Sequence, residues 1–134
     1  MALILIIEDV PAVLLSLKIV LEGLGHKIAA AKNGDQGLTL IKNGSFDLVI
    51  TDIWMPGKNG TDVIREARAH APATRFLAIT GGDPNSGESR DALRGKDFGA
   101  DRVLLKPFEK EELVTAVSLL LRGVTQVDGL AKVH

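Results

Sequence analysis

Residues 48–60 read LVITDIWMPGKNG, and this stretch decides the fold of the chain. It opens with four apolar or β-branched residues in a row, a continuous pattern that indicates a strand buried on both faces. The predicted strand ends at the carboxylate of Asp52, and Pro56, Gly57 and Gly60 follow, where the chain must turn. Strands buried on both faces belong to parallel sheets covered by helices, so the stretch predicts an α/β domain.

Similar apolar runs recur along the chain and alternate with segments of helical period. Residues 3–7, 76–79 and 103–105 are continuous runs, and residues 26–31 form a weaker run that we interpret as an edge strand. Between the runs, apolar residues recur every three or four positions, which is the period of a helix. We therefore expect a doubly wound five-stranded parallel sheet with five helices.

Two segments are less regular than the rest. Residues 81–87 are rich in Gly, Pro, Asn and Ser and predict a flexible loop, and the helix expected after it, from about 88 to 98, has few apolar positions. Residues 123–134 show no clear period, so we expect one domain over residues 1–122 followed by a poorly ordered C-terminal tail.

Composition narrows the class of protein. The 134 residues suit one domain, and 46% hydrophobic with 25% charged residues is typical of a globular protein. A formal net charge of −1 gives no overall attraction for nucleic acid or an anionic membrane. The absence of cysteine excludes disulfides and fits a reducing compartment. The apolar run at 3–7 is too short for a signal peptide or a membrane span, so we expect a cytoplasmic protein.

Polar side chains follow four of the five predicted strands. Glu8 and Asp9 follow the first, Asp52 ends the third, Thr80 follows the fourth and Lys106 the fifth. Ligands of open parallel sheets bind beyond the carboxyl ends of the strands, so these five residues make a candidate site.

Each of these residues alone has an ordinary explanation, because loops begin where strands end and Asp or Thr often caps the next helix. Their combination is harder to explain in that way. Carboxylates a few Å apart repel by roughly 4 kcal/mol per pair at an effective dielectric constant near 20. A fold accepts that repulsion mainly where a cation offsets it, and hard oxygen ligands point to Mg²⁺.

The motifs resemble those of the response-regulator receiver domain family, which is CheY-like. The resemblance spans about residues 2–122 and includes Glu8-Asp9, Asp52 in TDIWMPGKNG, Thr80 in AITGG and Lys106-Pro107-Phe108. It implies a flavodoxin-like fold with strand order 2-1-3-4-5. It also implies a phosphorylation-dependent signalling switch of two-component systems, which is a phosphoacceptor with self-catalysed transfer and slow autodephosphorylation rather than a turnover enzyme.

The resemblance also implies a role for each matching residue. Asp52 would take a phosphoryl group from a sensor histidine kinase or a histidine phosphotransfer protein and form an acyl phosphate. Asp9, Asp52 and the backbone carbonyl of Trp54 would hold Mg²⁺, and Glu8 would act through a bound water. We expect no direct contact with nucleic acid or membrane, and a monomer or weak dimer; the downstream target does not follow from the sequence.

Thr80 and Lys106 would bind the phosphoryl oxygens, with a cis peptide bond between Lys106 and Pro107. Val103 departs from the family pattern, because that position usually carries a Tyr or Phe ring that relays the signal. We therefore expect output through residues 81–98 instead, by a change of order.

Other classes remain as alternatives. A flavodoxin-type flavin-binding electron carrier shares the architecture, but Glu8 and Asp9 would repel a phosphate after the first strand. A hydrolase with an aspartyl-phosphate intermediate pairs its nucleophile with an acid two residues on, where this chain has Trp54. An inactive receiver that acts only as a binding module is the last alternative, and it is disfavoured because all motif residues are present.

Overall fold

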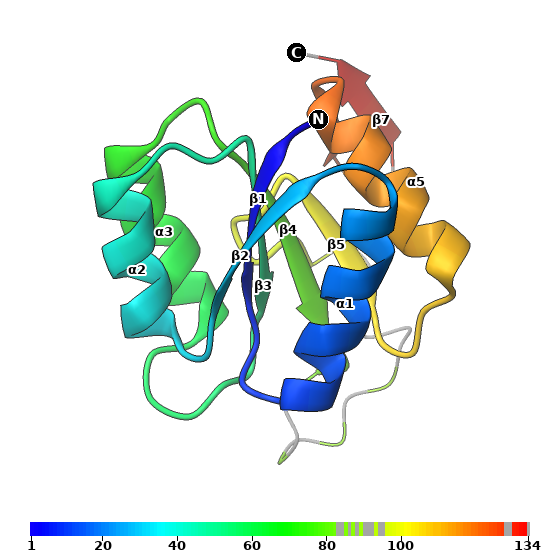
Figure 1. Cartoon of the computed structure of the whole chain (residues 1–134). Coiled ribbons are helices and arrows are strands. Elements are labelled where there is room, and N and C mark those ends of the chain that lie inside the picture. Colours follow the sequence, from blue (N-terminus) through cyan, green and yellow to red (C-terminus); the bar gives the residue numbers. More distant parts are fainter. Residues whose placement is uncertain are drawn as a thin grey trace.

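A five-stranded parallel sheet forms the middle layer of the molecule (Figure 1). The computed structural model describes residues 1–82, 85, 87, 89, 93, 96–127 and 130–133, with only the backbone for 124–127 and 130–133. In spatial order the strands are β2 (Lys27–Ala31), β1 (Leu3–Ile7), β3 (Leu48–Asp52), β4 (Arg75–Thr80) and β5 (Arg102–Leu105). The predicted order 2-1-3-4-5 is confirmed, with β2 at an edge as expected.

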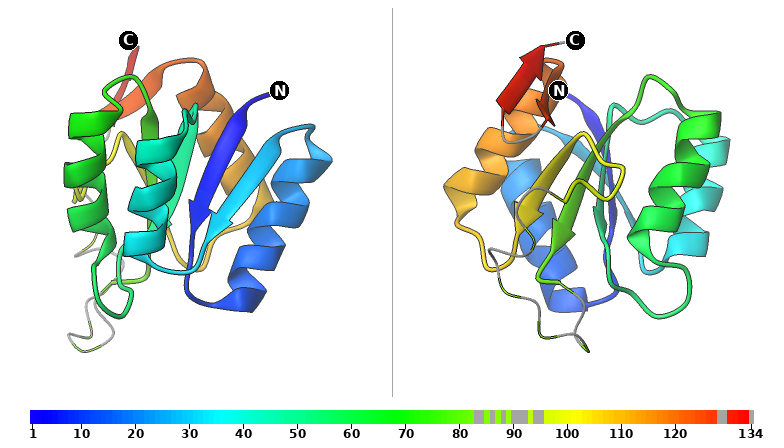
Figure 2. Two further views of the ribbon diagram at one scale, coloured as in Figure 1. Left: turned by 60° about the vertical axis from the view of Figure 1, so that its left-hand side comes forward. Right: turned by 180° about the vertical axis from the view of Figure 1, so that it is seen from behind.

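Helices cover both faces of the sheet (Figure 2). The helices α1 (Pro11–Gly23) and α5 (Lys110–Leu121) lie on one face, and α2 (Gly34–Asn43) and α3 (Gly60–His70) lie on the other. Side chains alternate between the faces of a strand, so Ile4 and Ile6 pack with α1 and α5 while Leu5 and Ile7 pack with α2 and α3. Every residue from Leu48 to Asp52 is buried, which explains the unbroken apolar run.

The part of the chain that the structure describes contains four helices rather than five. The helix expected from about 88 to 98 falls largely on residues outside the description, and so does much of the loop expected at 81–87. Within that stretch Leu93 is helical and buried. None of the described helices has the length and apolar character needed to cross a membrane.

The C-terminal segment, for which we expect a poorly ordered tail, contains two short strands. Strands β6 (Val124–Val127) and β7 (Leu130–Val133) pair in an antiparallel hairpin, with Val127 opposite Leu130. The two strands come from short runs of four residues, 124–127 and 130–133. A search for helical period or buried parallel strands does not detect such a pattern.

Candidate functional site

The sheet brings the polar strand ends together at its carboxyl edge. Asp52 is the last residue of β3 and stands opposite Ile79 of β4, directly before Thr80. Thr80 pairs with Leu105 of β5, and the backbone N–H of Lys106 donates to the carbonyl of Thr80 at 2.9 Å. Glu8 continues β1, whose last residue Ile7 stands opposite Thr51. The parallel register therefore makes neighbours of residues far apart in sequence.

Three carboxylates gather at this edge. Glu8, Asp9 and Asp52 each offer one oxygen, and these oxygens all lie within 4.8 Å of one another. Glu8 is only 1% exposed and Asp52 7%, while Asp9 is partly buried. Such a cluster of hard oxygen donors fits a small divalent cation such as Mg²⁺.

Lys106 supplies a positive charge to the cluster. Its Nζ lies 3.4 Å from Oδ2 of Asp52 and 3.7 Å from Oε2 of Glu8, and its side chain is 30% exposed. The Lys106–Pro107 peptide bond is cis, as the resemblance implied. One ammonium thus faces two buried carboxylates, with a third carboxylate close by.

Burial disfavours the ionised forms of Glu8 and Asp52 and so raises the pKa of both. Loss of solvation, and next the negative charge of Asp52, raise the pKa of Glu8 from 4.5 to about 7. Burial also raises the pKa of Asp52, although the charge of Lys106 opposes the rise. Oε1 of Glu8 accepts from Val10 N at 3.2 Å, but the buried Oε2 has no hydrogen-bond partner in the described structure. The cluster therefore has a deficit of positive charge.

The loop after β3 is fixed tightly behind Asp52. Oδ1 of Asp52 accepts from the N–H of Ile53 at 2.9 Å, and the N–H of Gly60 donates to the carbonyl of Ile53 at 2.8 Å. A Cβ on Gly60 would collide with the carbonyl oxygen of Asp52 and come within 2.9 Å of the Cα of Ile53, so only glycine fits there. Asn59 caps α3 by accepting from Asp62 N at 3.0 Å.

The remaining residues singled out in the sequence are Thr80, Trp54 and Val103. Thr80 is fully buried, and its Oγ1 accepts from Gly82 N at 2.9 Å. Val103 is partly buried in β5 and packs against the core on the α2 and α3 side. Trp54 packs against the same core; its buried Nε1 has no hydrogen-bond partner in the described part of the chain. Metal binding by the Trp54 carbonyl and the signalling roles of Thr80 and Val103 stay predictions.

An apolar cleft of about 650 Å³ lies between α1 and α5 beside the cluster. Lys106, Pro107 and Phe108 line it together with Val13 and Leu17 of α1. On the outer side of α1, Leu15 and Ile19 are 57% and 61% exposed. Sequence reasoning did not single out this surface, because apolar residues at helical spacing do not show which of them stay exposed.

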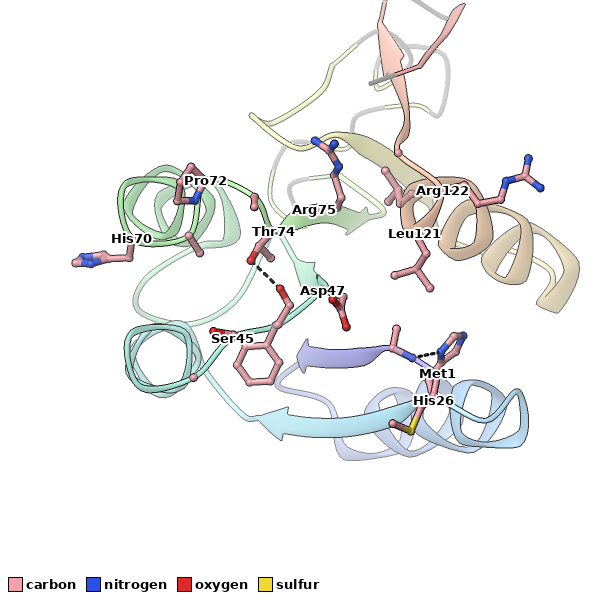
Figure 3. A pocket seen from close by; sticks show the side chains of 17 residues that line it. Met1, His26, Ser45, Asp47, His70, Pro72, Thr74, Arg75, Leu121 and Arg122 are labelled. Carbon is pink, nitrogen blue, oxygen red and sulfur yellow. Dashed lines mark hydrogen bonds between the residues drawn. The ribbon is translucent and has the colours of Figure 1, made fainter.

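A second cavity, of about 760 Å³, lies at the opposite edge of the sheet, where the strands begin (Figure 3). Two hydrogen bonds at this cavity join residues next to neighbouring strands. Ala2 N donates to Nδ1 of His26 at 3.1 Å, and Oγ1 of Thr74 donates to the carbonyl of Phe46 at 2.8 Å. None of the residues singled out in the sequence as site residues lines this cavity.

Comparison with known proteins agrees with the geometry. The family model of the response regulator receiver domain matches residues 4–118 of this chain. The transcriptional regulatory protein DltR of Streptococcus agalactiae is 31% identical over 88% of this chain and 51% of its own length. The DNA-binding response regulator MtrA of Mycolicibacterium smegmatis is 37% identical over 89% of this chain and 50% of its own. The chain thus spans about half the length of these two curated relatives.

Other relatives match over their full length. Protein PilH of Pseudomonas aeruginosa is 34% identical over 92% of this chain and 100% of its own. The structure of TrrA from Thermotoga maritima in complex with Mg²⁺-BeF has a TM-score of 0.75 and 31% identity, covering 90% of this chain and 99% of TrrA. These matches favour a receiver over a flavodoxin-type electron carrier. The chain therefore belongs to the response regulator receiver domain family, the phosphorylation-dependent switches of two-component signalling.

Proposed function

We propose that Asp52 is the residue of this chain that accepts the phosphoryl group, from a phosphohistidine donor and with Mg²⁺. The observation that carries the proposal is the convergence of Glu8, Asp9 and Asp52 within 4.8 Å, with Lys106 Nζ 3.4 Å from Asp52. A carboxylate oxygen of Asp52 attacks phosphorus, the P–N bond to the imidazole breaks, and the leaving imidazole nitrogen keeps the electron pair and is protonated. The product is an acyl phosphate.

The neighbouring residues either hold the metal ion or bind the phosphoryl oxygens. Asp9, Asp52 and the Trp54 carbonyl are the proposed metal ligands, and Glu8 contributes through a bound water. When bound, Mg²⁺ neutralises charge on the transferred group and orients it. Lys106 adds a cation that pairs with Asp52 before transfer and with phosphoryl oxygens afterwards. Thr80 donates its hydroxyl to the same oxygens, and its Oγ1 can keep accepting from Gly82 N while it does so.

The surface of α1 favours a histidine-bearing protein, rather than a small molecule, as the donor. Receiver domains receive their phosphoryl group from histidine kinases or phosphotransfer proteins. Leu15 and Ile19 lie one turn apart and are exposed, and α1 begins directly after the acidic cluster. A donor that buries both side chains brings its histidine to the edge where Asp52 lies.

The downstream steps belong to the same proposal. Some relatives of about twice this length are named as DNA-binding or transcriptional regulators, whereas PilH matches over its full length. For the residues of this chain we propose a switch in the cytoplasm, monomeric or weakly dimeric, that contacts a protein target rather than nucleic acid. Output through residues 81–98 in place of a ring at Val103 stays a prediction.

Intact-mass spectrometry tests the acceptor. With acetyl phosphate and Mg²⁺ the mass of the wild type rises by one phosphoryl group, and Asp52→Asn abolishes the rise. Asp62→Asn, which alters an exposed carboxylate of α3, is the matched control and keeps it. A phosphoryl group that persists on Asp52→Asn would remove Asp52 from this role.

A further inference from the structure

Arg68, near the end of α3, holds the turn that precedes β5. Its Nε and Nη2 both donate to the carbonyl of Gly99, at 3.1 and 2.8 Å. Nη2 also lies 3.2 Å from Oδ2 of Asp101, and the guanidinium lies over the ring of Phe76 at 4.9 Å from its centroid. The planar fork of arginine suits such a multiple contact, which a lysine does not reproduce.

The same turn holds a bulky residue in an unfavourable backbone conformation. Phe98 has φ 54°, in the left-handed region that residues other than Gly, Asn and Asp rarely adopt. Gly99, next to it, has φ 78°. Asp97 closes the turn, because its Oδ1 accepts from Gly99 N at 2.9 Å and its carbonyl accepts from Ala100 N at 2.8 Å.

The turn is also tied to the sheet. Asp101 N donates to the carbonyl of Phe76 at 2.9 Å, and Oδ2 of Asp101 accepts from Phe76 N at 2.8 Å. Asp101 therefore forms an ion pair with Arg68 and accepts a hydrogen bond from the backbone of β4, directly before β5 begins at Arg102. Arg68 thus contacts the residues that directly precede β5, the strand that ends just before Lys106.

The two ends of α3 touch two different parts of the switch. Its first residue, Gly60, packs against the backbone of Asp52 with no room for a side chain. Its last two turns carry Arg68 and so contact the turn before β5. The helix α3 therefore contacts the backbone of Asp52 at one end and the turn at residues 97–101 at the other.

We propose that Arg68 is a clamp that keeps the turn at residues 97–101 strained, and that this turn is a two-state joint between α3 and β5. In the clamped state Phe98 keeps its positive φ; in the released state Phe98 relaxes and the start of β5 is free to shift. The regulatory meaning of the joint rests on the proposed phosphorylation of Asp52, whereas the strain itself does not.

A double-mutant cycle on the whole chain tests the strain. Phe98→Gly removes both the strain and the contacts of the ring, whereas in an Arg68→Ala background only the contacts remain to be lost. In the Arg68→Ala background, Phe98→Gly should therefore lower the folding equilibrium constant by a factor about five or more times larger than in the wild type. Arg68→Lys provides a second background if Arg68→Ala does not fold, and Arg65→Ala, with an exposed pair to Asp62, is the control. Equal effects of Phe98→Gly in all backgrounds would overturn the clamp.

Amide NMR spectra with and without Mg²⁺ and beryllofluoride test the coupling. In the wild type, the signals of Ile53, Gly99 and Asp101 should all shift; in Arg68→Ala only that of Ile53 should respond. If Ile53 does not respond in the wild type, the proposed function fails, while the strain measured by the cycle is unaffected. If Ile53 responds and Gly99 does not, or if Gly99 responds equally without Arg68, the joint between α3 and β5 is refuted.

Discussion

Nζ of Lys106 lies 3.4 Å from Oδ2 of Asp52, and this pair crosses from the end of β5 to the end of β3. The same ammonium lies 3.7 Å from Glu8, so one positive charge serves two buried carboxylates. With Asp9 beside them, the cluster has more negative charge than Lys106 balances. Because of this imbalance, we expect the free energy of unfolding to depend on pH and on Mg²⁺.

The stability of the metal-free protein should fall as pH rises from about 4.5 to about 7. The pKa of Glu8 is raised in the folded state to about 7, so folding favours its protonated form. Between the two pKa values the unfolded chain has lost this proton while the folded protein retains it, so the free energy of unfolding decreases with pH by roughly 3 kcal/mol at most. Urea denaturation in a chelator at several pH values measures the slope.

Glu8→Gln is the matched variant for this measurement, because an amide does not titrate. Its slope between pH 4.5 and 7 should be clearly smaller than that of the wild type. An identical slope in the two proteins would show that Glu8 is not the group responsible.

Mg²⁺ should stabilise the folded protein, because it binds the assembled carboxylates and has little affinity for the unfolded chain. At a concentration one hundred times its dissociation constant, the free energy of unfolding rises by about 2.7 kcal/mol. Asp9→Asn should weaken both metal binding and phosphoryl uptake, and it should stabilise the metal-free protein by relieving repulsion. Thermal melts with and without Mg²⁺ measure this, and a wild-type melt indifferent to Mg²⁺ contradicts the site.

Leu15→Asp and Ile19→Asp should slow transfer from a phosphorylated histidine protein but not from acetyl phosphate. Both side chains are exposed, so the substitutions remove an apolar contact with a large donor and leave the core intact. A loss of about 1–3 kcal/mol in donor binding, or roughly fivefold to 150-fold, is expected for each. Leu24→Asp, at an exposed position past the end of α1, is the control. Equal rates for all variants would exclude this face of α1.

Gly60→Ala should destabilise the protein by about 3 kcal/mol or more, because its Cβ has no space beside the backbone of Asp52 and Ile53. Gly23→Ala is the matched control: a Cβ there meets nothing within 4 Å, so we expect little change or a slight gain. Chemical denaturation of both variants measures the difference, and a tolerated Gly60→Ala would mean that the loop after β3 adapts readily.

The sequence predicted the features that depend on neighbours along the chain or on repeated patterns. Buried strands appear in the sequence as apolar runs, and the ends of parallel strands meet at one edge, so the sequence alone predicts that Glu8, Asp52 and Lys106 lie close together. The edge position of β2 followed from its weaker run, and the structure agrees.

Features that depend on one distant contact did not follow from the sequence. Nothing in the sequence around Arg68 distinguishes it from a solvated helix residue, yet it lies against Gly99 and Asp101, 31 residues or more along the chain. The positive φ of Phe98 has no local signal, because the residue type disfavours it. The hairpin of β6 and β7 was missed because its short alternating strands lack the continuous pattern of the main sheet.

Trp54 has a practical consequence for following this protein in solution. It is the one tryptophan of the chain, and there is no tyrosine. Its indole is partly buried, with Nε1 shielded, two residues after Asp52. Fluorescence excited at the red edge of protein absorption therefore originates from a single known place, the loop that follows Asp52. The unlabelled molecule carries its own optical reporter, and stopped-flow emission can time ligand arrival and loop rearrangement without a dye.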